Sequence, residues 1–162
     1  MVIGADGLHS AVRRIAFGPQ ENYEKHLGYT VAAFEAADYR PRDEDVYVIY
    51  EQPGRHIGRF ALRGDCTLFL FVLAHDVGGI SYPYDLSAQK ALLRDVFADD
   101  EWELPQILVA LDSCTELYFD RVSQIKMDTW SQGRIGLIGD AAFCASLLAG
   151  QGSALAMTLH MY

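Results

Sequence analysis

The chain has few cysteines and few positive charges. Its 162 residues hold three cysteines, Cys66, Cys114 and Cys144, with no CxxC pair. This spacing favours buried thiols in a reducing compartment over a disulfide framework or a zinc site. Its 13 Lys and Arg residues face 22 Asp and Glu residues, giving a net charge of -9. Nucleic-acid binding requires clustered basic residues, so we expect an acidic, cytoplasmic protein with no nucleic-acid partner.

Other signatures are absent as well. The longest plainly apolar run, residues 68–74, is too short to span a bilayer. The first residues hold no basic segment followed by an apolar one, so no signal peptide is expected. The five histidines form neither HxH nor HExxH, and no GxSxG occurs. We therefore expect no membrane segment, no metal site and no serine nucleophile.

What the sequence does contain is typical of a packed domain. Its apolar share of 51% supports a core, and its length suits one ordinary domain or a small part of a larger one. Strands are expected at 28–36, 46–50, 56–62 and 67–73. A charged loop at 38–45 separates the first two and short turns join the others, which predicts an antiparallel meander. Helical spacing follows over 88–97, capped by Ser87, and over 107–111 after Pro105. Strands are expected again at 117–125 and 134–138, and an apolar helix at 152–159.

Both ends of the chain carry a strand, a Gly-and-Asp turn and a helix start. The segments are VIGADGLHSAVRR at 2–14 and LIGDAAFCASLLAGQGSAL at 137–155. One such turn is usually only a turn, but two at strand-to-helix junctions favour a ligand site, because ligands bind beyond strand carboxyl ends. A carboxylate such as Asp140 suits a sugar hydroxyl, and the free amides of residues 150–152 suit a polar ring. These features predict a nucleotide-like ligand.

Two motifs carry a family resemblance. GADGLHSAVRR resembles the GADGxxSxVR motif of the single-component FAD-dependent aromatic hydroxylases, the group with the p-hydroxybenzoate hydroxylase fold. GRIGLIGDAAFCASLLAGQGSALAM resembles the second FAD motif of that family, and YFDRVSQIKMDTWSQG resembles its lead-in. The resemblance implies an α+β fold, in which an antiparallel substrate-domain sheet with helices is flanked by partial elements of a Rossmann-like FAD-binding domain. It places FAD-binding segments at 1–20 and 129–162 and the substrate-domain part at 21–128.

The resemblance also implies roles for individual residues. Asp140 would hold the ribitol or ribose region of FAD, and Asp6 and Arg13 would touch the diphosphate region and the nicotinamide nucleotide. The complete set of expected cofactor-binding residues is Asp6, Gly7, Arg13, Gly139, Asp140, Gly150, Gln151 and Gly152. The expected substrate-pocket residues are Tyr47, Ile49, Phe60, Phe69 and Phe71. No catalytic acid or base is expected, because bound flavin carries the chemistry.

The chain departs from the family pattern at several places. Phe143 stands where the family often has His, and Ala145 and Leu147 stand where prolines are common. No GxGxxG occurs, although family members carry it near their start on a βαβ unit that holds the ADP half of FAD. By that comparison the chain is expected to be an internal fragment, a truncated product or one piece of a split enzyme. Unpaired surfaces would then favour a homodimer or pairing with a complementary chain.

Three functions remain open at the level of sequence. The first is an FAD-dependent, NAD(P)H-using monooxygenase that hydroxylates an aromatic or polycyclic small molecule. The second is a non-catalytic remnant, or one piece of a split flavoprotein, that acts through association with another chain. The third is a flavin-dependent reductase without oxygen transfer.

Overall fold

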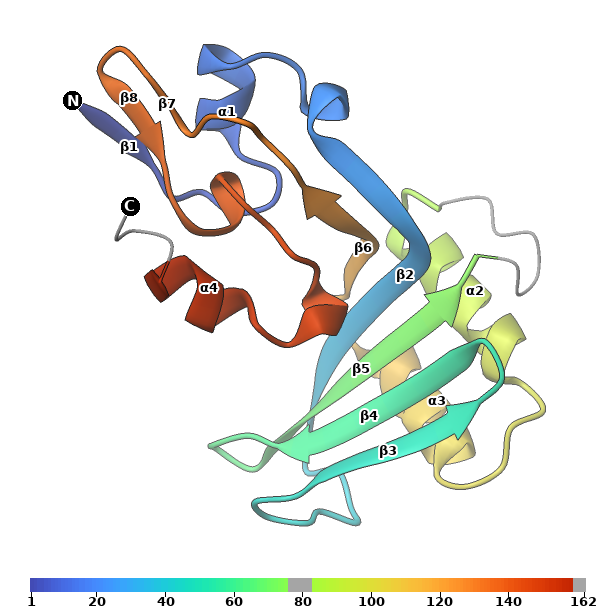
Figure 1. Ribbon diagram of the computed structural model, residues 1–162. Helices are drawn as coiled ribbons and strands as arrows, with labels where there is room; N and C mark the ends of the chain where they lie inside the picture. Colours follow the sequence, from blue (N-terminus) through green and yellow to red (C-terminus); the bar gives the residue numbers. More distant parts are fainter. Residues whose placement is uncertain (76–82, 159–162) are drawn as a thin grey trace. The chain divides into compact units, whose positions relative to one another are not determined.

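The computed structural model describes residues 1–75 and 83–158 (Figure 1). Its strands are β1 (Val2–Gly4), β2 (Glu24–Ala37), β3 (Tyr47–Gln52), β4 (Arg55–Ala61), β5 (Cys66–Ala74), β6 (Tyr118–Ile125), β7 (Ser131–Gln132) and β8 (Ile135–Leu137). Its α-helices are α1 (Ala11–Ala16), α2 (Leu86–Phe97), α3 (Leu104–Ser113) and α4 (Gly152–Thr158). Short 3-10 turns lie at η1 (Gln20–Asn22), η2 (Gly139–Ala141) and η3 (Leu147–Ala149). Residue 159, the expected end of the last helix, lies outside the described residues.

The strands form two sheets, and the predicted α+β fold is confirmed. The smaller sheet has the order β1-β8-β7, with β1 parallel to β8, and the larger has the order β3-β4-β5-β2-β6. Strands β3, β4 and β5 are antiparallel neighbours, as the short turns between them predict. The sheet at the chain ends therefore pairs distant segments, whereas the larger sheet contains a local meander.

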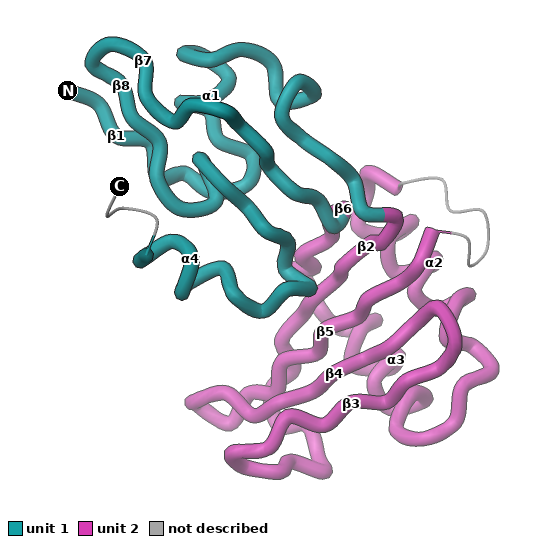
Figure 2. Tube along the Cα trace, in the orientation of Figure 1, with its two compact units in different colours: residues 1–27, 122–162 teal, residues 28–121 magenta. Residues whose placement is uncertain are grey.

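The chain divides into two compact units (Figure 2). Unit 1 consists of residues 1–27 and 122–162, and unit 2 of residues 28–121. The chain leaves unit 1 within β2 and returns to it within β6. That the outer segments hold FAD and the middle segment covers a substrate stays a prediction.

Unit 2 has its core on one face of its sheet. Alternate residues of a strand point to opposite faces, and α2 and α3 pack on one of them (Figure 1). That face buries aromatic rings, with Phe34 stacked on Phe69 at a centroid distance of 5.1 Å and Phe71 edge-on to Phe97 at 5.2 Å. The buried members of this core are Ala32, Phe34, Tyr39, Ile57, Phe69, Phe71, Leu73, Leu93, Phe97, Leu104, Ile107 and Leu111.

Unit 1 has a smaller core beneath its short sheet. Leu137, Ala141 and Ala142 are buried there, and Val12 and Trp130 pack against them. Small residues after β8 allow this close packing, because a large side chain would not fit between the turn and the helix. An isolated bridge between Ile125 and Cys144 ties the following segment to the end of β6.

Two sequence-based boundaries need correction. The cap of α2 is Asp85, whose carboxylate accepts a 2.8 Å hydrogen bond from the amide of Ala88, and not Ser87. Strand β2 begins at Glu24, four residues before the expected start at Gly28, and Gly28 itself has a φ of +80°. Glycine is typical of strand boundaries, so the sequence pattern placed the start of the strand at Gly28, whereas β2 continues through it.

Candidate functional site

The first Gly-Asp motif folds as a capped turn between β1 and α1. The Asp6 carboxylate accepts hydrogen bonds from the Ser10 hydroxyl at 2.5 Å and from the amides of Ala11 at 2.7 Å and Val12 at 3.1 Å. The Ser10 hydroxyl in turn accepts from the amide of Arg13 at 2.9 Å. These bonds, the one from Ser10 first, lower the pKa of Asp6. Both oxygens of Asp6 are therefore engaged in starting the helix.

The second motif follows β8. Register pairs Gly4 with Leu137, and the amide of Ile138 donates to the carbonyl of Gly4 at 2.9 Å. Because β1 and β8 run parallel, both motifs begin at the carboxyl ends of neighbouring strands, on the same side of the sheet. Gly139 takes a left-handed φ of +58°, which favours glycine, and opens the η2 turn that carries Asp140.

The two motifs line one hollow of about 590 Å³ in unit 1. We call it the two-motif hollow; its lining residues are Ala5, Gly7, Ile138, Gly139, Asp140, Gly152, Ser153, Ala156 and Met157. Segments more than 120 residues apart in the chain thus form one concave surface at a strand-to-helix edge. This is the place where open α/β sheets bind nucleotides.

Glycine leaves the backbone of this hollow accessible. A Cβ added at Gly7, where φ is +79°, would meet no atom within 4 Å. At Gly152 the nearest atom would be an Asp140 carboxylate oxygen at 3.9 Å. A bulky ligand can therefore approach the main chain closely, and the site fits a nucleotide cofactor.

Asp140 differs from Asp6 in its surroundings. Its side chain is exposed, and within residues 1–75 and 83–158 its carboxylate accepts no hydrogen bond. A carboxylate that lines a hollow without an internal donor is available to a ligand hydroxyl. The polar groups of the hollow are a hydrogen-bond-accepting carboxylate and accessible main chain, which suit the sugar portion of a dinucleotide.

The other expected cofactor residues take varied positions. Gly152 begins α4 and lines the hollow, whereas Gly150 and Gln151 are exposed and lie outside its lining. Gly150 has a left-handed φ of +61° and ends η3. Arg13 is fully buried and donates to the Ala141 carbonyl at 2.9 Å, so it also lies outside the lining.

The expected substrate residues fall into two groups on unit 2. Phe69 and Phe71 are fully buried in the core under α2 and α3. Tyr47, Ile49 and Phe60 point to the opposite face of the sheet, because each lies an odd number of residues from a core-facing neighbour. The five residues therefore do not share one face of the sheet, which the sequence could not reveal. That they line a substrate pocket stays a prediction.

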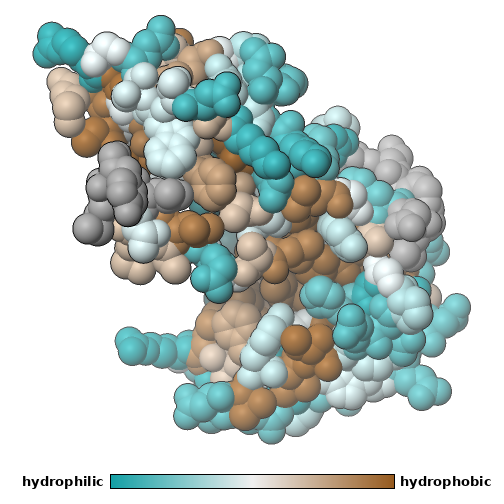
Figure 3. Space-filling model, in the orientation of Figure 1, coloured by the Kyte–Doolittle hydropathy of each residue, from teal (hydrophilic) through white to brown (hydrophobic). Residues whose placement is uncertain are grey.

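The opposite face is apolar and partly exposed. Tyr47 and Ile49 are 47% and 53% exposed, and the Tyr47 ring meets Phe60 edge-on at 5.5 Å. The Tyr47 ring also lies over Gly58, where an added Cβ would come within 2.1 Å of its hydroxyl. Register extends these rows to Leu68 and Leu70, which sequence reasoning missed. Figure 3 shows apolar side chains gathered over these strands.

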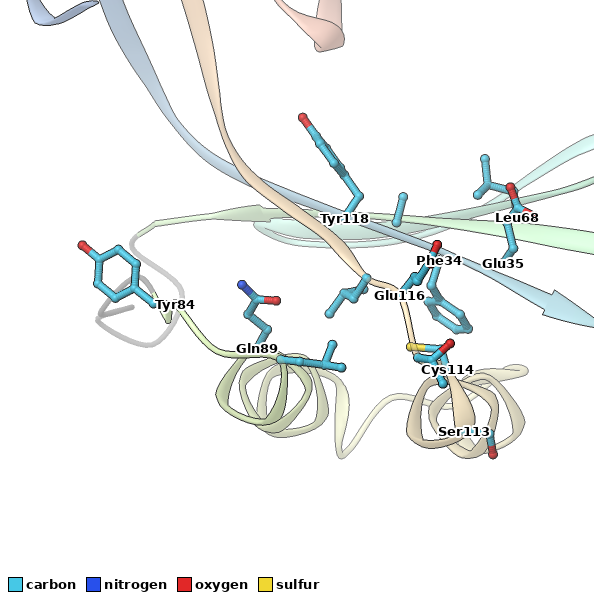
Figure 4. Close-up of a pocket in the computed structure, with 13 residues that line it drawn as sticks. Phe34, Glu35, Leu68, Tyr84, Gln89, Ser113, Cys114, Glu116 and Tyr118 are labelled. Atoms are coloured by element: carbon cyan, nitrogen blue, oxygen red, sulfur yellow. The ribbon is translucent and has the colours of Figure 1, made fainter. Parts of the chain in front are cut away.

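Unit 2 also contains a second hollow of about 930 Å³ (Figure 4). Its labelled side chains include Glu35 on β2, Gln89 on α2, and Cys114 and Glu116 on the segment that leads to β6. None of the predicted site residues lines it. The sequence motifs therefore point to unit 1, and not to this larger hollow.

The described residues show neither a metal centre nor a membrane-spanning helix. Among residues 1–75 and 83–158, no group of three or more His, Cys, Asp or Glu side chains is arranged to hold a metal ion. Within the same ranges, no helix has the length and apolar character needed to cross a membrane.

Comparisons with known proteins identify the family of this chain. The family described as "FAD binding domain" matches residues 1–160. The chain belongs to this family. Its fold class is therefore that of FAD-binding proteins.

Three relatives illustrate the likeness. An uncharacterized protein of Mycobacterium tuberculosis is 40% identical over 163 residues, covering 97% of this chain and 42% of the relative. A flavin-dependent monooxygenase of Legionella longbeachae is 35% identical, covering 96% of this chain and 40% of the relative. The crystal structure of tetracycline destructase Tet(55) aligns with a TM-score of 0.81 and 31% identity, covering 97% of this chain and 41% of that protein. The chain thus spans about two fifths of the length of the proteins that it matches.

Proposed function

We propose that this chain supplies the flavin-side half of an FAD site in a monooxygenase that hydroxylates an aromatic or polycyclic molecule with electrons from NADH or NADPH. The observation that carries the proposal is the meeting of both Gly-Asp motifs in the two-motif hollow. The flavin-dependent monooxygenase of Legionella longbeachae, which is 35% identical, supports the reaction class.

We assign the residues of the hollow to binding and orientation. Asp140 accepts a hydrogen bond from a ribitol or ribose hydroxyl, and Gly7 and Gly139 let the cofactor approach the main chain. The main-chain amides of residues 150–152 would bind the polar edge of the flavin ring, although only Gly152 of the three lines the hollow. Asp6 acts by fixing α1 and the loop that carries Gly7. Bound flavin supplies the redox and oxygen-transfer chemistry, so no side chain of this chain has to act as an acid or base.

We assign the substrate to the opposite face of the unit 2 sheet. Tyr47, Ile49 and Phe60 supply flat apolar area there, and Leu68 and Leu70 extend it. Such a surface excludes water from an aromatic ring and stabilises it by burial. Phe69 and Phe71 act indirectly by packing the sheet on α2 and α3.

We propose further that β1 pairs with a strand outside this chain, in the cytoplasm. In the described sheet β1 lies at one edge, and Val2 and Ile3 are each 53% exposed. Unpaired, apolar edges favour strand addition. Sedimentation velocity of the pure chain is expected to show a dimer, whose formation Ile3→Lys abolishes; a monomer at all concentrations argues against pairing with a second copy.

The cofactor step is tested by titrating FAD into the chain and following flavin fluorescence. Saturable quenching is expected, weakened about tenfold or more by Asp140→Ala and unchanged by Asp128→Asn, which alters an exposed aspartate outside the hollow. Absence of binding by the wild-type chain contradicts the proposal.

The reaction class is tested with the flavin-loaded protein, NADH or NADPH, an aromatic substrate and isotopically labelled O2. One labelled oxygen atom is expected in the product and the other in water. Oxidation of NADH or NADPH without label in the product identifies a reductase and contradicts hydroxylation.

A further inference from the structure

Arg13 is the largest fully buried side chain of the described residues, although it is charged. Burying a guanidinium is costly unless its N–H groups find acceptors. One terminal nitrogen donates to the Ala141 carbonyl at 2.9 Å. The other donates to the Leu8 carbonyl at 2.5 Å and to the Gln20 side-chain oxygen at 3.2 Å. Both terminal nitrogens of this buried cation thus have acceptors, three in all, whereas its Nε has no hydrogen-bond partner among the described residues.

The positions of the two carbonyl acceptors explain what this feature does. Leu8 directly follows Gly7, and Ala141 directly follows Asp140. Gly7 in the first motif and Asp140 in the second both line the two-motif hollow. One planar guanidinium therefore connects the loops of both motifs, and its fork geometry sets their spacing.

Gln20 fixes the orientation of the Arg13 guanidinium. Its side-chain nitrogen lies 2.9 Å from His9 Nδ1 and donates to a Glu24 carboxylate oxygen at 2.8 Å, so its oxygen faces Arg13. Burial lowers the pKa of Arg13, and the nearby carboxylates of Glu24 and Asp6 oppose that shift. A guanidinium remains protonated in proteins, so these hydrogen bonds hold a cation in a fixed position.

We infer that Arg13 is a positioning residue that holds the Gly7 and Asp140 loops at the spacing FAD requires, and that it does not itself contact the cofactor phosphates. The inference rests on the proposed function, because it concerns the same hollow. It replaces the role that the sequence motif implies with one that full burial of the side chain permits.

The first test needs no cofactor. Hydrogen exchange is measured in the chain without FAD at the amides of Ala142 and Phe143, which both donate to the Gly139 carbonyl at 2.9 Å. Arg13→Gln is expected to speed their exchange about tenfold or more, because the Ala141 carbonyl loses its anchor. The control is Arg14→Gln, which alters the exposed neighbour. Equal exchange in both variants overturns the inference.

The second test separates positioning from direct contact. FAD affinity is measured for Arg13→Gln, Asp140→Asn and the double variant. If Arg13 acts through the Asp140 loop, the effects are non-additive, and Arg13→Gln costs several-fold less affinity in the Asp140→Asn background. Additive losses indicate an independent contact and overturn the inference.

Two controls keep the result decisive. Arg13→Lys keeps the charge but cannot span both carbonyls. Its Ala142 and Phe143 amides are expected to exchange faster than those of the wild type, and it is expected to bind FAD more weakly. Wild-type exchange and affinity in Arg13→Lys would overturn the inference even if Arg13→Gln fails to fold. Leu111→Ala destabilises the core of unit 2 and is expected to leave exchange at Ala142 unchanged under native conditions. If the wild-type chain takes up no FAD, the proposed function fails, whereas the exchange comparison still decides the role of Arg13.

Discussion

At the scale of single residues, the two motif aspartates differ in what their carboxylates do. Asp6 accepts three hydrogen bonds from its own helix start, whereas Asp140 accepts none within the described ranges. The first carboxylate therefore stabilises the fold, and the second is available to a ligand. The same residue type after the same kind of strand serves two purposes.

The role of Asp6 predicts a pH dependence of stability. Its pKa is lowered in the folded state, so it contributes stability above its unfolded pKa, and this contribution is lost as pH falls through the lowered value. Asp6→Asn is expected to lower the melting temperature at neutral pH, and the gap to wild type is expected to narrow below about pH 4. The control is Asp128→Asn. A gap that is constant from neutral to acid pH would contradict the capping role.

Gly4 is predicted to be required where β1 meets α1. A Cβ there would come within 2.8 Å of Leu137 Cδ2 and of Val12 Cβ, and Val12 Cβ cannot swing away. Gly4→Ala is expected to lower the free energy of unfolding by about 1–3 kcal/mol. Gly136→Ala on the neighbouring strand, where a Cβ meets nothing within 4 Å, is the matched control. Urea unfolding compares the two, and equal stability would argue against the close packing.

Gly58 is predicted to matter for the surface and not for folding. A Cβ at Gly58 displaces the exposed Tyr47 ring, which can rotate outward at little cost. In Gly58→Ala, the nuclear Overhauser contacts between the rings of Tyr47 and Phe60 are expected to disappear while unfolding changes little. Retained ring contacts would show that Tyr47 does not lie over Gly58.

Residue-level reasoning from sequence found the motif aspartates but not their division of labour. The segment VIGADGLHSAVRR does not show that the Asp6 carboxylate accepts hydrogen bonds from the Ser10 hydroxyl and two main-chain amides. Nor does it show that Arg13 reaches a carbonyl 128 positions away. The Arg13–Ala141 bond depends on a tertiary contact, which local patterns do not encode, whereas the partners of Asp6 lie within the same segment.

At the scale of elements, α2 and α3 stabilise unit 2 by covering one face of its sheet. Phe97 on α2 meets Phe71 on β5 edge-on, and the Arg55 guanidinium lies 5.8 Å from the Phe97 ring centroid. Phe97→Ala is expected to lower the free energy of unfolding by about 3–5 kcal/mol, because it leaves a cavity in a closed core. Denaturant unfolding measures the loss.

The matched control for this core is Val109→Ala on α3. Val109 is 67% exposed, so its truncation is expected to change stability by less than about 0.5 kcal/mol. Similar losses in both variants would mean that Phe97 does not pack between helix and sheet as described.

Element-level prediction worked best where contacts are local. Turns at Pro53-Gly54 and Gly64-Asp65 fix the β3-β4-β5 meander, and Pro105 marks the start of α3. The parallel pairing of β1 with β8 was not predicted, because the residues between them carry no local signal of it. Which sheet face α2 and α3 cover was likewise open, so the sequence did not show on which face Phe69 and Phe71 lie.

At the scale of the whole molecule, family membership accounts for the architecture. The FAD-binding family matches nearly all of the chain, and a 14-residue strand, β2, carries the chain from unit 1 to unit 2. The chain spans about two fifths of its relatives, so the activity of the whole protein remains our proposal. The central claim of the proposal is that two motifs far apart in the sequence form a single cofactor-binding surface.

The most direct measurement of that claim is a titration of isotope-labelled chain with FAD, followed by amide chemical shifts. The account predicts saturable shifts, with one common dissociation constant, at Gly7, Gly139, Asp140 and Gly152, and their loss in Asp140→Ala. Shifts confined to one motif, or confined to the larger hollow of unit 2, would contradict it.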